Sequence, residues 1–168
     1  MKTKQIVTRA AGVIVVVGAL IGAGAVAQAN EQSGDHASKA QSRAIEGVWE
    51  SVVTARDCQT QAPIFSFRSM ASYIRGGSLV VENNGQPFER ATGLGVWRHG
   101  SSRNFTSALQ FFTYAPDGTP SGRARSSSRV RMSADGKSFR SSDTVEVSDL
   151  NGIVILQGCA TQEAIRLQ

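Results

Sequence analysis

Apolar and polar residues alternate from residue 103 to the end of the chain, in extended runs that are separated by short turns. Alternation with a period of two is typical of β-strands that bury one face. The joints at 116–118, 134–136 and 150–152 each contain Asp-Gly or Asn-Gly, a strong hairpin signal because both residues tolerate a positive φ. The pattern predicts an antiparallel meander of four strands, over residues 103–114, 119–133, 137–149 and 152–167.

Four further strands are predicted before this meander. They cover residues 45–56, 65–74, 77–83 and 93–99. For 65–74 the competing interpretation is a helical turn. Strands of about 12 residues span about 40 Å, a length that suits a coiled sheet closing on itself. Because helical periodicity is absent after the N-terminal segment, residues 44–168 are predicted to form one all-β domain.

The N-terminal segment has the pattern of an export signal. The first nine residues carry three basic residues and no acid, and residues 10–27 carry no charge. Small residues then favour cleavage after Ala27 or Ala29, so that 1–29 would be a signal peptide. An uncleaved membrane anchor is the alternative. Residues 30–43 are polar and are predicted to be a disordered linker in a periplasmic or secreted protein.

The two cysteines, Cys58 and Cys159, bear on the topology. In an exported protein they favour one disulfide, the alternative being two free buried thiols. Cys58 follows the first predicted strand and Cys159 lies within the last, so the bridge makes these strands neighbours. In an up-and-down barrel the first and last strands are antiparallel only when the strand number is even. We therefore predict a single closed eight-stranded antiparallel up-and-down barrel.

The same bridge predicts a register. If the two strands pair beside it, positions whose numbers add up to about 217 face each other. Ser51 would then lie opposite Arg166, and Trp49 opposite Gln168. This register brings Trp49 and Arg166 close together.

Gly47-Val48-Trp49 opens the first predicted strand, and Arg166 stands near the end of the last. These positions resemble the calycin arrangement, in which lipocalins carry a Gly-x-Trp whose indole closes the barrel base beneath an Arg from the end of the chain. The chain is also similar to exported bacterial barrels of the allene-oxide-cyclase type. A second Gly95-Val96-Trp97 is not part of that pattern, and the helix before the last lipocalin strand has no room here. The resemblance implies a calycin-like fold, closed by Trp49 and Arg166, and a binding function.

Side chains alternate between the two faces of a strand, and this alternation predicts an interior lined by large apolar residues and by small residues with hydroxyl groups. The inward sets are Trp49, Ser51 and Val53; Phe105, Ser107, Leu109 and Phe111; Ala124, Ser126, Ser128, Val130 and Met132; and Phe139, Ser141, Asp143, Val145 and Val147. Such a lining suits either a packed core or a modest cavity for a small, mainly apolar ligand. The predicted ligand contacts are Trp49, Trp97, Phe105, Phe111 and Phe139 as apolar walls, with Ser107 or Asp143 fixing the orientation.

Four arginines lie on one face of the strand that is predicted over residues 119–133. The arginine stripe consists of Arg123, Arg125, Arg129 and Arg131. It favours either contact with an anionic envelope surface or a solvated outer face whose arginines pair with Glu146 and Asp149 across the hairpin. Three of the 18 basic residues lie in the leader and all 13 acids follow it, which leaves a net charge of +2. This small charge does not favour a nucleic-acid partner.

Catalytic chemistry has little support in the sequence. His99 is the single histidine outside the N-terminal tail, and it falls in a predicted turn. No spaced cluster of metal ligands occurs, so neither a metal, a cofactor nor a catalytic residue is assigned. An inward Asp143 would have a raised pKa and could transfer protons, which keeps a small barrel cyclase or isomerase as the alternative to a binding protein.

Overall fold

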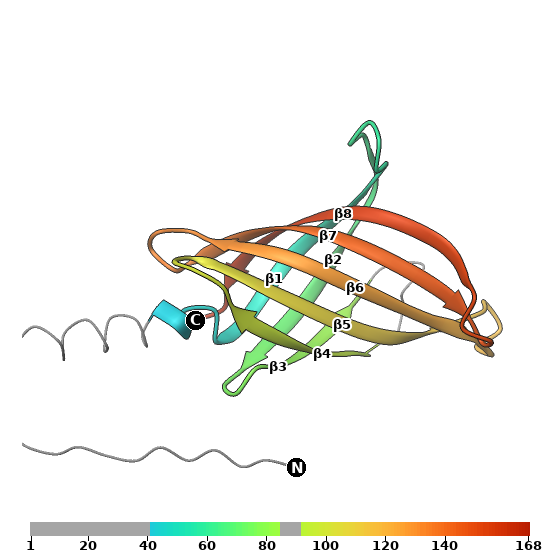
Figure 1. Ribbon diagram of the computed structural model, residues 1–168, viewed down its shortest axis with the longest axis horizontal. Coiled ribbons are helices and arrows are strands. Elements are labelled where there is room, and N and C mark those ends of the chain that lie inside the picture. Colours follow the sequence, from blue (N-terminus) through green and yellow to red (C-terminus); the bar gives the residue numbers. More distant parts are fainter. Residues whose placement is uncertain (1–40, 85–91) are drawn as a thin grey trace, which may run out of the picture.

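The computed structural model describes residues 41–84 and 92–168; the predicted signal peptide and most of the predicted linker lie outside this part of the chain. Eight strands form one closed barrel in sequence order, with every strand antiparallel to its neighbours and the last strand beside the first (Figure 1). They are β1 (Gly47–Arg56), β2 (Pro63–Ile74), β3 (Ser78–Asn83), β4 (Thr92–His99), β5 (Asn104–Tyr114), β6 (Pro120–Met132), β7 (Ser138–Asp149) and β8 (Val154–Arg166). The predicted fold class is confirmed, including a strand over 65–74.

The hairpin turns follow the predicted chemistry. Gly118, Gly136 and Gly152 have φ angles of 85°, 69° and 84°, which a residue with a Cβ rarely adopts. Asp117 accepts hydrogen bonds from the backbone N–H and the hydroxyl of Thr119, at 2.9 and 2.7 Å. These bonds stabilise the carboxylate and hold the pKa of Asp117 below its usual range. Each turn therefore combines a permissive glycine with a side chain that satisfies the backbone.

Strand β1 pairs with β8 as the predicted disulfide requires. Cys58 and Cys159 are bonded, with their Cα atoms 5.2 Å apart. The predicted register is wrong by two residues, because Trp49 lies opposite Arg166 rather than Gln168. Cys58 lies in the turn after β1, and Arg56 is the residue that pairs with Cys159 in the sheet.

The barrel interior has a closed end filled by aromatic rings. Trp49 packs edge-on against Phe139, with ring centroids 4.9 Å apart. Tyr73 contacts Phe139 at 6.0 Å and Trp97 at 6.4 Å, and Trp97 contacts Phe105 at 6.0 Å. All five rings are buried. Edge-on packing of this kind leaves little free volume, so this end is a solid core.

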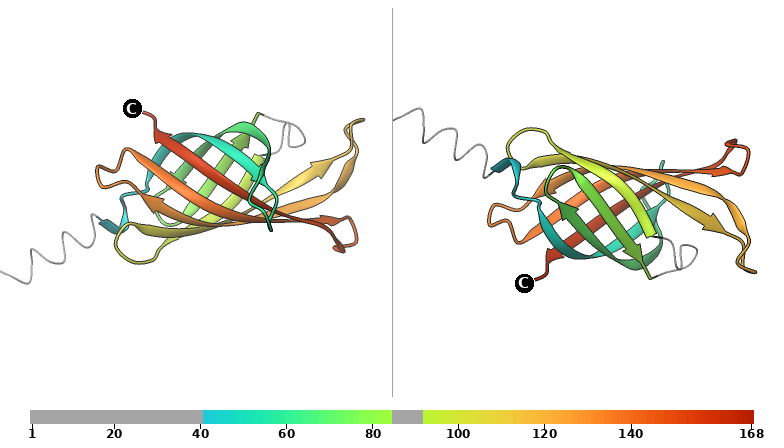
Figure 2. Two further views of the ribbon diagram at one scale, coloured as in Figure 1. Left: turned by 90° about the horizontal axis from the view of Figure 1, so that it is seen from above. Right: turned by 90° about the horizontal axis from the view of Figure 1, so that it is seen from below.

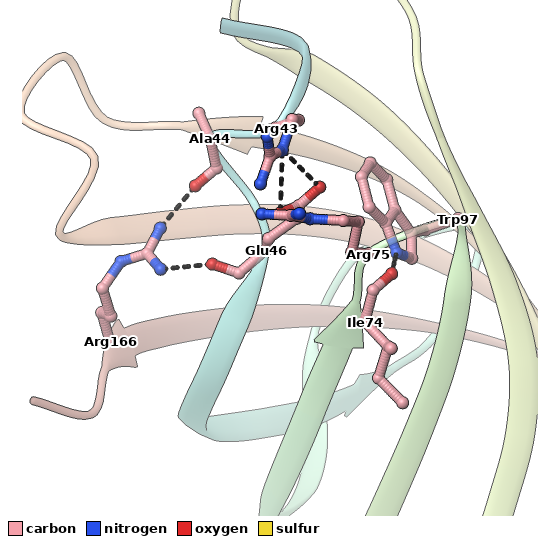
Figure 3. Close-up of polar contacts among 7 residues, drawn as sticks. All are labelled: Arg43, Ala44, Glu46, Ile74, Arg75, Trp97 and Arg166. Carbon is pink, nitrogen blue, oxygen red and sulfur yellow. Dashed lines mark hydrogen bonds and ion pairs between the residues drawn. The ribbon is translucent and has the colours of Figure 1, made fainter. Parts of the chain in front are cut away.

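Arg166 covers the closed end from outside. Its guanidinium lies 4.2 Å from the ring centroid of Trp49 and donates hydrogen bonds to the carbonyl oxygens of Ala44 and Glu46 (Figure 3). Burial lowers the pKa of Arg166. Gly47 has a φ of 133°, and a Cβ at this position would lie 2.5 Å from a guanidinium nitrogen of Arg166. The glycine of Gly-x-Trp therefore makes room for the arginine.

Further polar contacts fix the same end. Glu46 pairs with Arg43 at 3.0 Å and with Arg75 at 3.7 Å (Figure 3). The indole N–H of Trp97 donates to the carbonyl oxygen of Ile74 at 2.9 Å. These contacts tie the segment before β1 to the turn after β2.

The other end is open and asymmetric. The hairpins β5–β6 and β7–β8 extend beyond the rest of the barrel and diverge at their tips (Figure 2). A second, smaller apolar cluster lies at this end, formed by Phe111, Ala124, Leu109, Val145 and Val147. Within the described ranges, no helix is long and apolar enough to cross a membrane.

Candidate binding site

A belt of small polar side chains crosses the barrel interior between the aromatic core and the open end. Alternation along β1, β2, β5 and β7 turns these side chains inward. The buried members are Ser51, Ser69, Ser107, Ser141 and Asp143. Serines are much smaller than the aromatic residues of the closed end, so the belt leaves space near the barrel axis.

That space is an interior cavity of about 80 Å³. Its polar lining includes Ser69, Ser107, Ser128, Asp143 and Gln162. Its apolar lining includes Val53, Phe67, Leu109, Phe111 and Val145. This volume holds several water molecules or one small head group, whereas a drug-sized ligand needs about 300 Å³ or more. A larger ligand would have to extend toward the open end.

The residues predicted as ligand contacts fall into two groups. Ser107, Phe111 and Asp143 line the cavity. Trp49, Trp97, Phe105 and Phe139 belong to the closed-end core and do not line it. The structure therefore places Ser107, Phe111 and Asp143 around the cavity and the four aromatic rings in the core at the closed end.

Sequence reasoning missed Phe67, Ser69 and Gln162 as cavity residues. The parity of 65–74 contains the signal for the first two, because Phe67 and Ser69 share a face with the buried Ala71 and Tyr73. The position of Gln162 in the cavity lining can be predicted only if the register of β8 is known, and the alternation of side chains does not give that register.

Asp143 is the charged residue of the belt, and its side chain is only 8% exposed. Burial raises its pKa, and hydrogen bonds from Ser128 and Ser141 partly oppose this shift. The hydroxyl of Ser141 lies 3.0 and 3.1 Å from the two carboxyl oxygens. The ion pairs of the described residues do not include Asp143. It is thus a buried carboxyl group with neutral hydrogen-bond partners.

A chain of hydrogen bonds runs across the belt from Asp143. Ser141 Oγ also lies 3.3 Å from Gln162 Oε1, and Gln162 Nε2 donates to Ser51 Oγ at 2.6 Å. Ser51 in turn donates to the carbonyl oxygen of Ser69 at 3.3 Å. Ser141 has a single hydroxyl hydrogen, so it can donate to Asp143 or to Gln162 but not to both. A protonated Asp143 can donate to Ser141 and complete the chain, whereas an ionised Asp143 takes the Ser141 hydrogen and leaves Gln162 Oε1 without that donor.

Two more hydroxyl groups face this region. Ser69 Oγ is buried without any hydrogen-bond partner among the described residues, which is rare for a buried polar atom. Tyr73 bonds to Ser107, and burial raises its pKa far above the usual range. The cavity therefore contains the hydroxyl group of Ser69, which is free to donate and accept hydrogen bonds, and Tyr73, which stays neutral.

The outer face of β6 carries the arginine stripe, but the expected pairing across the hairpin is not observed. The ion pairs of the described residues do not join Arg125 or its stripe neighbours to Glu146 or Asp149. Glu146 instead accepts a hydrogen bond from Gln157 at 3.2 Å, and Asp149 accepts from the backbone N–H of Ile153 at 2.8 Å. The carboxylates are used locally, and the arginines remain available to solvent.

A shallow groove of about 630 Å³ lies on this outer face. Arg98 and Arg129 flank Thr106 in the sheet register, and small side chains such as Ala108 and Ser127 form its floor. The groove therefore combines two arginines with small polar and apolar side chains.

Candidate metal ligands and His99 both occur in the described ranges. No three His, Cys, Asp or Glu side chains there lie close enough to hold a metal ion. His99 ends β4, where its Nε2 lies 2.8 Å from the carbonyl oxygen of Ser102 and its ring lies 5.0 Å from that of Phe105. It lies beside the closed-end core rather than in the cavity lining.

Fold and site together define a closed eight-stranded antiparallel barrel with an interior cavity of mixed polar and apolar lining, an architecture consistent with a calycin-like fold. Comparison with protein-family models, with curated proteins and with solved structures finds no match to this chain.

Proposed function

We propose that the protein is an exported, lipocalin-like barrel that binds a small, mainly apolar molecule through its open end. The observation that carries this proposal is the cavity between the aromatic core and the apolar cluster at the open end. Phe67, Phe111 and Val145 offer apolar contact to a ligand that enters there. The disulfide is consistent with an oxidising compartment.

Native mass spectrometry of residues 30–168, isolated without detergent from a periplasmic or secreted fraction, tests for a carried ligand. Titration with the neutral apolar dye N-phenylnaphthylamine then tests the site. Ser126→Phe places a large ring in the cavity lining and is expected to weaken dye binding at least about tenfold, because it fills the space that the dye needs.

The matched control is Ser127→Phe, which adds the same ring to the outer face of the same strand. Circular dichroism must show that both variants fold. Equal dye affinity in Ser126→Phe and Ser127→Phe would contradict interior binding.

The unpaired arginine stripe favours a second function, contact with an anionic envelope surface. Replacing Arg123, Arg125, Arg129 and Arg131 with Ser should then abolish binding to vesicles that contain phosphatidylglycerol, and replacing them with Lys should preserve most of it. Vesicles of phosphatidylcholine alone are the control. Unchanged partition of the Ser variant would exclude this function.

A further inference from the structure

The cavity contains a carboxyl group without a counterion. Asp143 is buried, and the ion pairs of the described residues leave it out. Buried charges in proteins are normally paired, because an unpaired charge in an apolar interior is strongly unfavourable. Burial raises the pKa of Asp143 and so favours its neutral, protonated form, and the Ser141 hydroxyl lies 3.0 Å from one of its carboxyl oxygens. A cation that entered the cavity would remove the need for that proton.

The same cavity contains other unfilled acceptors. Ser69 Oγ lines it and has no partner. Gln162 Oε1 also lines it and loses the Ser141 donor once Asp143 ionises. An ionised Asp143, Ser69 and Gln162 thus present three acceptors around one space of about 80 Å³. An alkylammonium head group has up to three N–H donors and one positive charge, which matches this set.

We propose that the ligand is an amine with an apolar body, and that its ammonium group enters the cavity and pairs with the carboxylate of Asp143. This inference rests on the proposed function and specifies its ligand class. The cavity accommodates the head group and its first carbon atoms, and the remaining apolar body lies against Phe67, Leu109 and Phe111 toward the open end. A carboxylate ligand would instead meet a like charge at Asp143, and a neutral alcohol could not compensate the charge.

Binding of this kind is linked to pH. The folded pKa of Asp143 is raised by burial, so the carboxyl is neutral below that pKa and offers no charge to an ammonium group. Amine affinity should therefore rise with pH through the pKa of Asp143 and then stay constant until the amine itself loses its proton, near pH 10 for an ordinary alkylamine. The interior side chains that face Asp143 are Ser128, Ser141, Tyr73 and Gln162, and none of them titrates in this window.

Isothermal titration of residues 30–168 with octylamine, octanol and octanoate tests the inference, since the three probes share one apolar chain. At about pH 8 we expect octylamine to bind at least about tenfold more tightly than octanol, and octanoate to bind most weakly. Asp143→Asn should remove the preference for octylamine over octanol. Asp135→Asn, which removes one negative charge at an exposed turn, is the charge-matched control and should keep the preference.

The outcomes separate the inference from the proposed function. If octanol binds and octylamine binds no better, or if Asp143→Asn retains the preference, the amine inference is overturned while apolar binding stands. If none of the three probes binds, both are overturned. Should Asp143→Asn fail to fold, the wild-type pH profile decides: an octylamine affinity that does not rise between about pH 4, the ordinary pKa of the carboxyl group, and about pH 8 contradicts the inference.

Discussion

The closed end and the open end of the barrel interior are built from different side chains and have different roles. At the closed end, Phe139 contacts both Trp49 and Tyr73 edge-on, and the three residues are buried almost completely. Half-way along the axis the side chains become small and polar, and a cavity appears beside Asp143. Packing of large rings stabilises a fold because it buries apolar area without voids. Small polar residues around a void contribute little in this way, so the closed end stabilises the barrel and the open half remains available for a ligand.

A disulfide bond links two segments near the open end, where few apolar side chains are buried. Cys58 lies in the exposed turn after β1, and its bond to Cys159 joins that turn to β8. Beyond this bridge β8 carries exposed apolar residues, and Leu156 is 55% exposed. The disulfide therefore holds together the region that side-chain packing holds least.

Removing the disulfide is expected to have the largest effect. The bridge closes a loop with a sequence separation of 101 residues, and in the chain-entropy model such a link stabilises by up to about 4.7 kcal/mol. Replacing both Cys58 and Cys159 with Ser should lower the free energy of unfolding by an amount approaching this value, measured by urea denaturation. Reduced wild-type protein should behave in the same way. A loss below about 1 kcal/mol would show that packing, rather than the bridge, holds the open end.

Phe139 and Phe111 allow a direct comparison of the two ends. Phe139→Ala removes a ring that contacts both Trp49 and Tyr73 and should lower the free energy of unfolding by about 4 kcal/mol. Phe111→Ala removes the same atoms from the cavity wall and should cost about 2 kcal/mol, because part of its surroundings is already empty. Urea denaturation of the two variants measures both values. Equal losses would mean that the open half is packed as tightly as the closed end.

The alternation pattern and the cysteine pair together were sufficient to predict the fold. Alternation and turn residues such as Gly118 and Gly136 placed the strands, their antiparallel order and the inward faces, and the Cys58–Cys159 bridge required closure with an even number of strands. The register between β1 and β8 was wrong by two residues because it took Cys58 as the residue opposite Cys159, whereas the sheet places Arg56 there and the bridge reaches Cys159 from the following turn.

The candidate site was predictable only in part. The alternation along a strand shows which side chains face the interior, but it does not show how far along the barrel axis each one lies. Trp49 and Asp143 were therefore predicted to contact the same ligand, although Trp49 lies in the solid core and Asp143 lines the cavity. Gln162 was missed because β8 shows no alternation near its start. Ile155 and Leu156 are both exposed there, where the strand extends beyond its partner β1.

The smallest effect should be a gain in stability from Asp143→Asn. Because the folded pKa of Asp143 is raised, the unfolded chain ionises first as the pH rises, and the wild type loses stability from about pH 4 up to the folded pKa. Asparagine has no such loss, and its amide can take part in a hydrogen bond with the Ser141 hydroxyl at the place of the carboxyl group. We expect the variant to match the wild type below about pH 4 and to exceed it by about 1 kcal/mol once the pH has passed the folded pKa of Asp143, measured by urea denaturation across this range.

Asp135→Asn provides a control of opposite sign. Hydrogen bonds from the Ser133 hydroxyl and the Lys137 backbone N–H lower the pKa of Asp135, so its contribution is present above the unfolded pKa and lost as the pH falls through the folded pKa. This variant should therefore be less stable than the wild type near neutral pH and converge with it in acid. If Asp143→Asn instead destabilised the protein at every pH, Asp143 would be a structural residue of the hydrogen-bond chain. A gain confined to high pH would show that the carboxyl group of Asp143 weakens the fold when it ionises, as the proposed amine site requires of an acid without its cation.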